Sequence, residues 1–187
     1  MESADNVIAL KHSTEGVKNA LGTVFQRNSL IRVFNELAFF TGMSNLAIQC
    51  FRYSSIVEAT LPTSLRTVTG YNTFGNCANL KRLEVLEGMT AQNASQWIWE
   101  SGRTGMLLIL PSTLISMASD TLSTHGNNDT TVIVCKATIP PTKSNTSYHS
   151  TIKYVYVPDD SVEAYKAAAG WSQFPAKIKP LSEFVEP

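Results

Sequence analysis

Residues 55–62 read SIVEATLP, a short run whose apolar side chains have the spacing of a half-buried strand. Ile56, Ala59 and Leu61 form a template in which the second apolar residue follows the first by three positions and the third follows by two. Ala59 and Leu61 alternate with polar neighbours, as in a strand that buries one face. Pro62 cannot donate a hydrogen bond to a neighbouring strand, so we expect the strand to end there.

The template recurs at regular intervals along the chain. Its first position is weak in two copies, where Gly105 and Asp129 stand in place of a large apolar residue. A unit this short cannot bury its apolar edge alone, so stacked units are needed to make a continuous core. The repeat therefore predicts a solenoid with a parallel β-sheet of about six short strands and irregular return segments. The last template positions, 22 to 25 residues apart, are Phe39, Leu61, Val85, Leu110, Val134 and Val157.

Charge and hydropathy exclude several classes of protein. The 187 residues contain 15 Lys+Arg and 15 Asp+Glu, so the chain lacks the excess of basic residues expected of a nucleic-acid binder. The longest apolar run, residues 106–110, is far shorter than the roughly 20 residues that span a bilayer. We expect no nucleic-acid partner and no membrane insertion. The first residues also lack the apolar stretch of a secretory signal, which favours an intracellular or virion-associated protein, or a mature cell-surface or secreted form.

No catalytic motif is present in the sequence. It has no G-x-S-x-G, Walker or G-x-G-x-x-G pattern, and the SGRTG of residues 101–105 lacks the lysine and helix start of a phosphate loop. Cys50, Cys77 and Cys135 are widely spaced, which indicates buried free thiols rather than disulfides or a zinc knuckle. Asp159 and Asp160 precede a predicted helix, so helix capping is favoured over metal binding. We expect a protein without enzymatic activity, cofactor or metal.

Several stretches of the chain resemble the repeat of BspA-like leucine-rich repeat proteins, a class found in gut Bacteroidales and their phages. The resemblance covers roughly residues 34–180, and Phe74 and Cys77 match the F-x-x-C element of that repeat. It implies a leucine-rich-repeat-type solenoid that serves adhesion and recognition and carries no common catalytic residues. The stretches are TLPTSLRTV (60–68), FGNCANLKRLEV (74–85), LILPSTLISMASDTL (108–122), VIVCKATIPP (132–141) and YVYVPDDSVEAYKAAAGW (154–171).

Both ends of the chain are predicted to cover the open ends of the solenoid. At the C-terminus, Asp160 and Glu163 have the spacing of a capping box, which predicts a helix from Ser161 to about Ala169 that stops at Gly170. We expect its buried face and the segment after it to contribute Val162, Tyr165, Ala169, Trp171, Phe174 and Ile178.

At the N-terminus, Thr14 is a candidate cap for a second helix, in which Val17, Leu21, Val24 and Phe25 recur at helical spacing. The expected organisation is an N-terminal helical cap over residues 1–33, a solenoid over residues 34–158, and a C-terminal helical cap and tail over residues 159–187.

Strand alternation also predicts which side chains face away from the core. In the first half of the repeat they are polar, but in the second half they form an apolar and aromatic surface if the coils stack in register. A monomer rarely leaves such a surface bare, so we expect a partner, an inter-repeat loop or the C-terminal tail to cover it. The predicted contact residues are Leu107, Ile109, Ile133, Tyr154 and Tyr156.

Trp97 and Trp99 are further candidates for partner binding. In an extended chain the two tryptophan side chains point the same way and Ile98 points to the opposite side. Ile98 comes 24 residues after Phe74, one repeat later, and is therefore expected to take the core position that Phe74 has in its own coil. Aromatic side chains give a large contact area at low entropy cost. The alternative is that one or both tryptophans belong to the core.

These patterns predict a non-enzymatic binding or adhesion module that recognises a protein partner or a cell-surface glycan through the sheet face. The alternative is a structural component of a phage particle, such as a fibre or decoration protein, which would self-associate or contact its neighbours in the virion. The mass in solution distinguishes the two, because a stable trimer favours a fibre and a monomer favours an adhesin.

Overall fold

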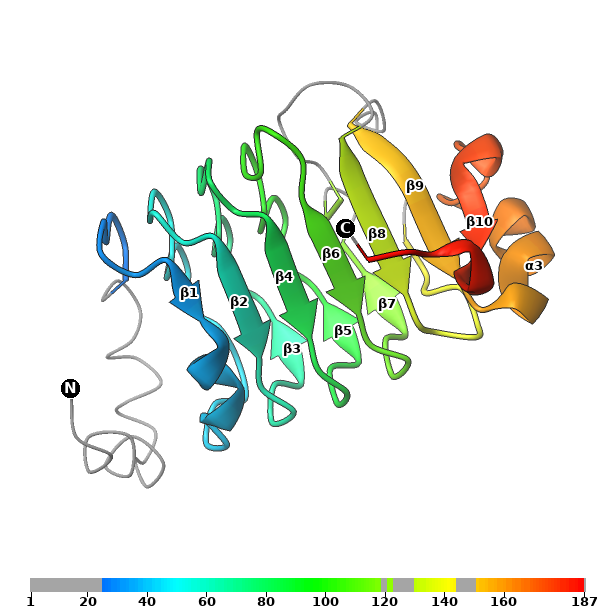
Figure 1. Ribbon diagram of the computed structural model, residues 1–187. Helices are drawn as coiled ribbons and strands as arrows, with labels where there is room; N and C mark the ends of the chain where they lie inside the picture. Colours follow the sequence, from blue (N-terminus) through cyan, green and yellow to red (C-terminus); the bar gives the residue numbers. More distant parts are fainter. Residues whose placement is uncertain (1–24, 119–120, 123–129, 144–150, 187) are drawn as a thin grey trace.

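The computed structural model describes residues 25–118, 121–122, 130–143 and 151–186. The chain winds into a solenoid whose coils stack so that their strands join one long sheet (Figure 1). All neighbouring strands in it are parallel, which confirms the predicted solenoid. In spatial order the seven strands are β1 (Val33–Phe34), β2 (Glu58–Leu61), β4 (Arg82–Val85), β6 (Leu107–Leu110), β8 (Thr131–Cys135), β9 (Ile152–Val157) and β10 (Ile178–Pro180).

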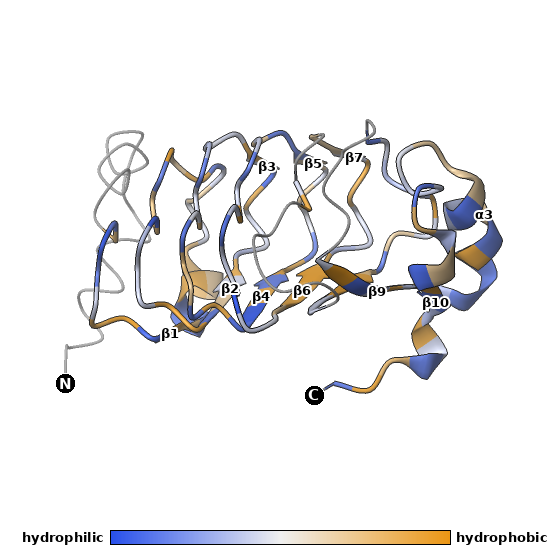
Figure 2. Cartoon of the chain, turned by 90° about the horizontal axis from the view of Figure 1, so that it is seen from above, coloured by the Kyte–Doolittle hydropathy of each residue, from blue (hydrophilic) through white to orange (hydrophobic). Residues whose placement is uncertain are grey.

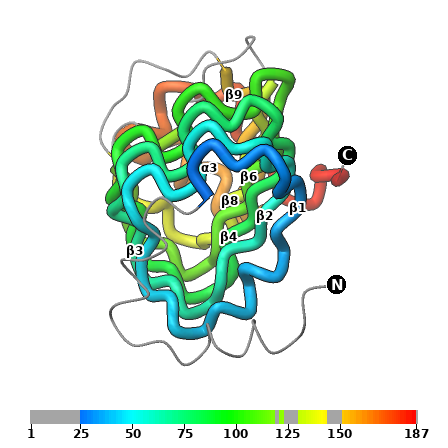
Figure 3. The backbone as a smooth tube through the Cα atoms, turned by 90° about the vertical axis from the view of Figure 1, so that its left-hand side faces the viewer, coloured from blue at the N-terminus to red at the C-terminus, as the bar shows by residue number. Residues whose placement is uncertain are grey.

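A smaller parallel sheet lies on the opposite side of the coils (Figure 3). It contains β3 (Thr67–Val68), β5 (Ala91–Gln92) and β7 (Ser116–Met117), one strand from each of three coils. Leu61 and Leu83 of the long sheet and Val68 of the small sheet are all fully buried. The main core therefore lies inside the coils, between the two sheets.

The central coils have the register that the template predicts. Ala59 pairs with Leu83, and Leu83 pairs with Leu108, so equivalent apolar residues stack directly across the sheet. All three are fully buried. Stacking identical positions gives each inward side chain a neighbour on both sides, which is how a repeat too small to have its own core becomes stable.

The register predicted for the fifth copy of the template is wrong by one residue. In β8, Ile133 pairs with Leu108 and Cys135 pairs with Leu110, and both are fully buried in the main core. Val134, which was expected to point inward, lies instead in a separate cluster on the outer face. Residues 132–135 are all apolar, so alternation alone cannot choose between the two faces, and a shift of one residue exchanges them.

The first template copy also differs from the structure. Phe34 pairs with Ala59 at the end of β1, and the chain then forms the 3-10 helix η1 (Asn35–Phe39) instead of continuing as a strand. A 3-10 helix has about three residues per turn, so Phe34, Leu37 and Phe40 share one side. Leu37 and Phe40 are buried, whereas Phe39 is 61% exposed.

An aromatic stack runs through the turns on the return side of the coils. The rings of Phe25 and Phe51 are stacked 5.0 Å apart, and those of Phe51 and Phe74 are stacked 4.8 Å apart. Trp97 continues the series edge-on, 6.3 Å from Phe74. Phe74 therefore packs between Phe51 and Trp97 and links the cores of adjacent coils.

The C-terminal end is covered by η2 (Asp159–Ser161), α3 (Val162–Ala167) and η3 (Pro175–Lys177). Tyr165 and Trp171 are fully buried, and each donates a 2.8 Å hydrogen bond to a backbone carbonyl of the last coils, Ala137 and Pro141 respectively. The predicted apolar cap is therefore present at this end. No helix among the described residues has the length and apolar character needed to cross a bilayer.

Details of the predicted C-terminal helix are wrong. The helix ends at Ala167, and Ala169 is exposed, so Ala168 packs against the core in its place. No capping box forms, because Asp160 lies within η2 and Ser161 is the N-cap residue; the Ser161 hydroxyl donates instead to the Thr138 carbonyl, 2.8 Å away. The predicted N-terminal helix, with Thr14, Val17, Leu21 and Val24, lies outside the described residues.

The last segment of the chain turns back along the solenoid. After β10, the 3-10 helix η4 (Leu181–Glu183) leads into residues 184–186, which run across the outside of the long sheet (Figures 1 and 2). We refer to residues 181–186 as the tail. Its position places it on the surface that was predicted to bind a partner.

Candidate functional site

The outer face of the long sheet has a charged half and an apolar half. On β2 and β4, the Arg82 guanidinium lies 2.8 Å from Glu84 and 3.9 Å from Glu58, and Lys136 extends the network with a 3.7 Å contact to Glu84. Opposite charges on neighbouring strands stabilise each other across the sheet. This half of the face is polar, as the strand alternation predicts.

The apolar half forms a second core outside the coils. Leu107, Ile109 and Val134 are buried there, and Val132, Tyr156, Leu181 and Phe184 pack against them. Phe184 of the tail lies with its ring 5.1 Å from that of Tyr156. The tail therefore covers much of the predicted apolar surface, which is one of the outcomes that the sequence left open.

Two polar contacts hold the ends of the tail. The Ser182 amide donates a 3.0 Å hydrogen bond to Asp159, and the Glu186 carboxylate accepts a 3.1 Å hydrogen bond from Arg82. The hydrogen bonds from Ser182 hold the pKa of Asp159 below its ordinary value. Asp159 thus anchors the tail. No cluster of three or more potential metal-ligating side chains occurs in the described part of the chain.

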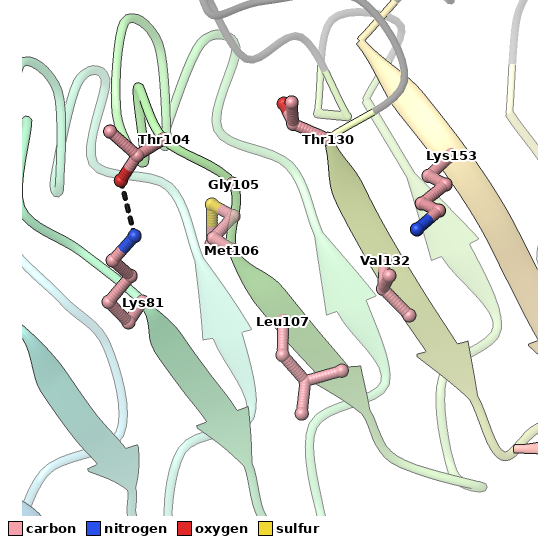
Figure 4. Close-up of a pocket in the computed structure, with 8 residues that line it drawn as sticks. All are labelled: Lys81, Thr104, Gly105, Met106, Leu107, Thr130, Val132 and Lys153. Atoms are coloured by element: carbon pink, nitrogen blue, oxygen red, sulfur yellow. Dashed lines mark hydrogen bonds between the residues drawn. The ribbon is translucent and has the colours of Figure 1, made fainter. Parts of the chain in front are cut away.

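An open hollow lies beside the tail, where β4, β6, β8 and β9 begin (Figure 4). Its volume is ≈ 340 Å³, and its apolar lining includes Met106, Leu107 and Val132. Lys81 and Lys153 stand on opposite sides, and Thr104 and Thr130 line the end nearest the loops. The hollow therefore combines an apolar floor with two ammonium groups and two hydroxyls.

The two lysines line the hollow from opposite sides, and both of their side chains are exposed. Lys81 donates a hydrogen bond to the Thr104 hydroxyl, and the Lys153 ammonium lies 5.8 Å from the centre of the Tyr154 ring. Neither forms an ion pair within the described ranges, and both side chains are exposed. Strands lie about 4.8 Å apart, so three strand steps from β4 to β9 place the two lysine backbones about 14 Å apart. They can contact two separate acidic groups of one ligand.

The structure brings together only part of the predicted contact surface. Leu107, Ile109 and Tyr156 lie side by side under the tail, and Tyr154 adjoins them with its ring 6.0 Å from that of Tyr156. The prediction for Ile133 is wrong, because the register of β8 turns this side chain into the main core.

The candidacy of Trp97 for partner binding is also wrong, and the alternative of a core tryptophan holds for this residue. Trp97 is fully buried and its indole N–H donates a 2.9 Å hydrogen bond to the Thr121 carbonyl. Residues 95–100 form a turn in which Gln96 and Glu100 have positive φ angles, so the chain is not extended and Trp97 and Ile98 both point inward. Trp99 is half-buried at the turn, on the return side of the coil, away from the outer face of the long sheet.

Sequence reasoning missed the lysines of the hollow. Each of them directly precedes an outward-facing residue of its strand, Arg82 after Lys81 and Tyr154 after Lys153. The two lysines therefore occupy the same position of the repeat, and the sequence pattern could have identified them by that shared position. The contact between Arg82 and Glu186 has no such local signal.

All three cysteines are buried thiols, as predicted. Burial raises the pKa of Cys50 to about 12 and that of Cys77 to about 11, and it also raises the pKa of Cys135. Thiols with raised pKa values form little thiolate at neutral pH, which is the form that acts as nucleophile and metal ligand. All three side chains are part of the main core.

Comparison with known protein families matches the chain to the BspA type leucine-rich repeat region, in six copies, over residues 24–115 and 44–168. These ranges span well over half of the chain. A search among curated proteins finds no match.

Proposed function

The chain belongs to the BspA-type leucine-rich repeat family, and from this premise we propose that it is a binding module that recognises its partner through the outer face of the long sheet. Repeats of this family generally mediate protein–protein interaction, and the family is generally a non-enzymatic scaffold. Stacked strands present a broad rigid surface, which suits recognition without reorganisation.

The hollow between Lys81 and Lys153 is the observation that carries this proposal. Its apolar floor can bury an aliphatic or aromatic group, and its ammonium groups can pair with acidic groups on either side. A few polar groups around an apolar depression are typical of ligand sites, because the floor provides affinity and the polar rim provides orientation. The partner is then a protein surface or a cell-surface glycan that carries acidic groups.

Charge reversal on the hollow tests the proposal. The chain would be screened against arrays of sialylated, sulfated and neutral glycans and against a library of acidic peptides. We expect the Lys81→Glu/Lys153→Glu variant to lose at least tenfold in affinity for the ligands found. The matched control is Lys166→Glu on α3, which lies on the cap away from the hollow and should bind normally.

Two outcomes would contradict the proposal. Ligands that bind the charge-reversed variant as tightly as the wild type do not use this face. A stable trimer in light scattering, with no ligand found, would favour the alternative of a structural component in a phage particle.

A further inference from the structure

We propose that the surface beneath the tail is a peptide-docking site, and that its partner is a flexible segment of another protein with the chemistry of the tail. That chemistry is two apolar side chains three residues apart and an acidic residue two positions later, as in Leu181, Phe184 and Glu186. This inference rests on the proposed function, since it names the kind of partner that the outer face accepts.

The tail lies on the sheet in the manner of a bound peptide. Leu181 and Phe184 face the sheet and are half-buried, while Ser182, Glu183 and Val185 are exposed. Within the described residues, the tail backbone donates no hydrogen bond to the strands that it crosses, and its amide bonds go to Leu181 and to the Asp159 carboxylate. Two apolar contacts and two end anchors therefore hold it.

The apolar surface beneath the tail does not depend on the tail for its structure. Leu107, Ile109 and Val134 belong to strands that are paired on both sides, so their positions are set by the sheet. Their neighbours Leu108 and Leu110 point into the main core, which forms a separate cluster. Removing the tail would expose an apolar surface but leave the main core intact. Such a surface favours an occupant of matching chemistry.

The open hollow offers a place for a partner to start. Leu107 and Val132 line the hollow and also belong to the cluster under the tail, so the two surfaces are continuous. A segment that first contacts the hollow can extend along the apolar strip while the tail leaves it. Displacement has a cost, because a tethered tail acts at an effective concentration of about millimolar. The intact chain should therefore bind such a segment more weakly than a chain whose tail is released.

The experiment uses the full chain with the tail released by substitution. In Leu181→Ser/Phe184→Ser, both apolar contacts of the tail are removed. The matched control is Val185→Ser, because Val185 lies in the same tail but is 83% exposed. The probe is a fluorescein-labelled peptide with the sequence LSEFVE, and a scrambled peptide of the same composition tests specificity. Binding is followed by fluorescence anisotropy.

We expect the released variant to bind the peptide at least tenfold more tightly than the wild type and the Val185→Ser control. Adding Tyr156→Ser to the released variant should abolish binding, since Tyr156 contacts Phe184. If the double substitution impairs folding, as circular dichroism would show, Asp159→Ala/Glu186→Ala removes the two acceptors that anchor the tail instead and should increase the affinity by a smaller factor.

Three results would overturn the proposal. The first is that the wild type and a folded, released variant bind LSEFVE with equal affinity. The second is that the released variant binds the scrambled peptide as tightly as it binds LSEFVE. The third is a concentration-dependent dimer of the released variant, because the occupant would then be a second copy of this chain. None of these results depends on Lys81 or Lys153, so the docking site can fail while ligand binding at the hollow stands.

Discussion

The guanidinium of Arg82 on β4 lies 3.1 Å from the carboxylate of Glu186, although the two residues are 104 positions apart in the chain. To make this contact the tail crosses β9 and β8 (Figure 1). Arg82 is also bound to Glu84, so the tail ends on a side chain whose position is already set. The pair thereby sets how far along the face the tail extends.

Removing the charge of Glu186 should loosen the tail without unfolding the solenoid. Both side chains of the pair are partly exposed, so we expect a loss of at most about 1 kcal/mol in Glu186→Gln. The Phe184 amide, which donates to Leu181 within the tail, should then exchange its hydrogen up to about fivefold faster. Salt at about 1 M should give the wild type a similar increase, since it screens the pair. Unchanged exchange in both conditions would show that the ion pair does not restrain the tail.

The two tryptophans of the turn should respond very differently to truncation. Trp97 is fully buried and hydrogen-bonded to Thr121, so Trp97→Ala should lower the free energy of unfolding by about 3–5 kcal/mol. Trp99 is half-buried, and Trp99→Ala should cost clearly less. Urea denaturation of the two variants measures the difference. Equal losses would mean that Trp97 is not the core residue of this pair.

Trp171 should be essential for closing the C-terminal end. It is fully buried, and its indole N–H donates to the Pro141 carbonyl, 2.8 Å away. We expect Trp171→Ala to lower the free energy of unfolding by about 3–5 kcal/mol, and Trp171→Phe to lose about 1–3 kcal/mol because the carbonyl keeps no partner. Thermal and urea unfolding check both values, and a Trp171→Ala variant as stable as the wild type would contradict the predicted cap.

The buried thiols should make the protein less stable in alkali. Burial raises the pKa of Cys50 from 9.0 to about 12. Below pH 9 both states hold the proton, so the free energy of unfolding does not change. Above that, the unfolded chain releases a proton that the folded chain keeps, and stability falls by up to about 1.4 kcal/mol per pH unit. Cys50→Ala should reduce this slope between about pH 9 and 11. Urea titrations across that range measure the slope. If the free energy of unfolding falls with pH equally in the wild type and in Cys50→Ala, the raised pKa of Cys50 is not the cause.

Lys143 should have the opposite dependence on pH. Its ammonium group has no hydrogen-bond partner within the described residues, and it lies 5.6 Å from the ring centres of Trp171 and Phe174. Burial lowers its pKa from 10.5 to about 8. The folded state therefore bears the full cost of the charge below pH 8. As the pH rises from 8 to 10.5 that cost is relieved, because only the unfolded chain still holds the proton.

Replacing Lys143 by methionine should remove this cost. We expect Lys143→Met to raise the free energy of unfolding at pH 7 by about 1–3 kcal/mol, with the gain shrinking toward pH 10. The control is Lys166→Met, because Lys166 is less buried and pairs with Glu163. A gain that is the same at pH 7 and pH 10 would show that the charge of Lys143 is not its cause.

The strands of the central coils could be predicted because their alternation permits one register. Glu58 and Thr60 flank Ala59, and a polar residue cannot exchange places with a buried one without a large cost. In β8 the chain from Val132 to Cys135 is apolar throughout, so alternation carries no information there. Pairing with β6 and the irregularity after Thr131 decide that Ile133 and Cys135 turn inward.

The sequence by itself determined the repeat, the parallel solenoid and the aromatic residues that close its C-terminal end, because local spacing and apolar composition are enough to specify them. Only the tertiary structure decided what covers the outer face. Leu181 and Phe184 lie in a short segment with no periodicity, and they become part of a core only because they pack against Leu107 and Ile109. Contacts between segments so far apart depend on how many coils lie between them, which no local pattern records.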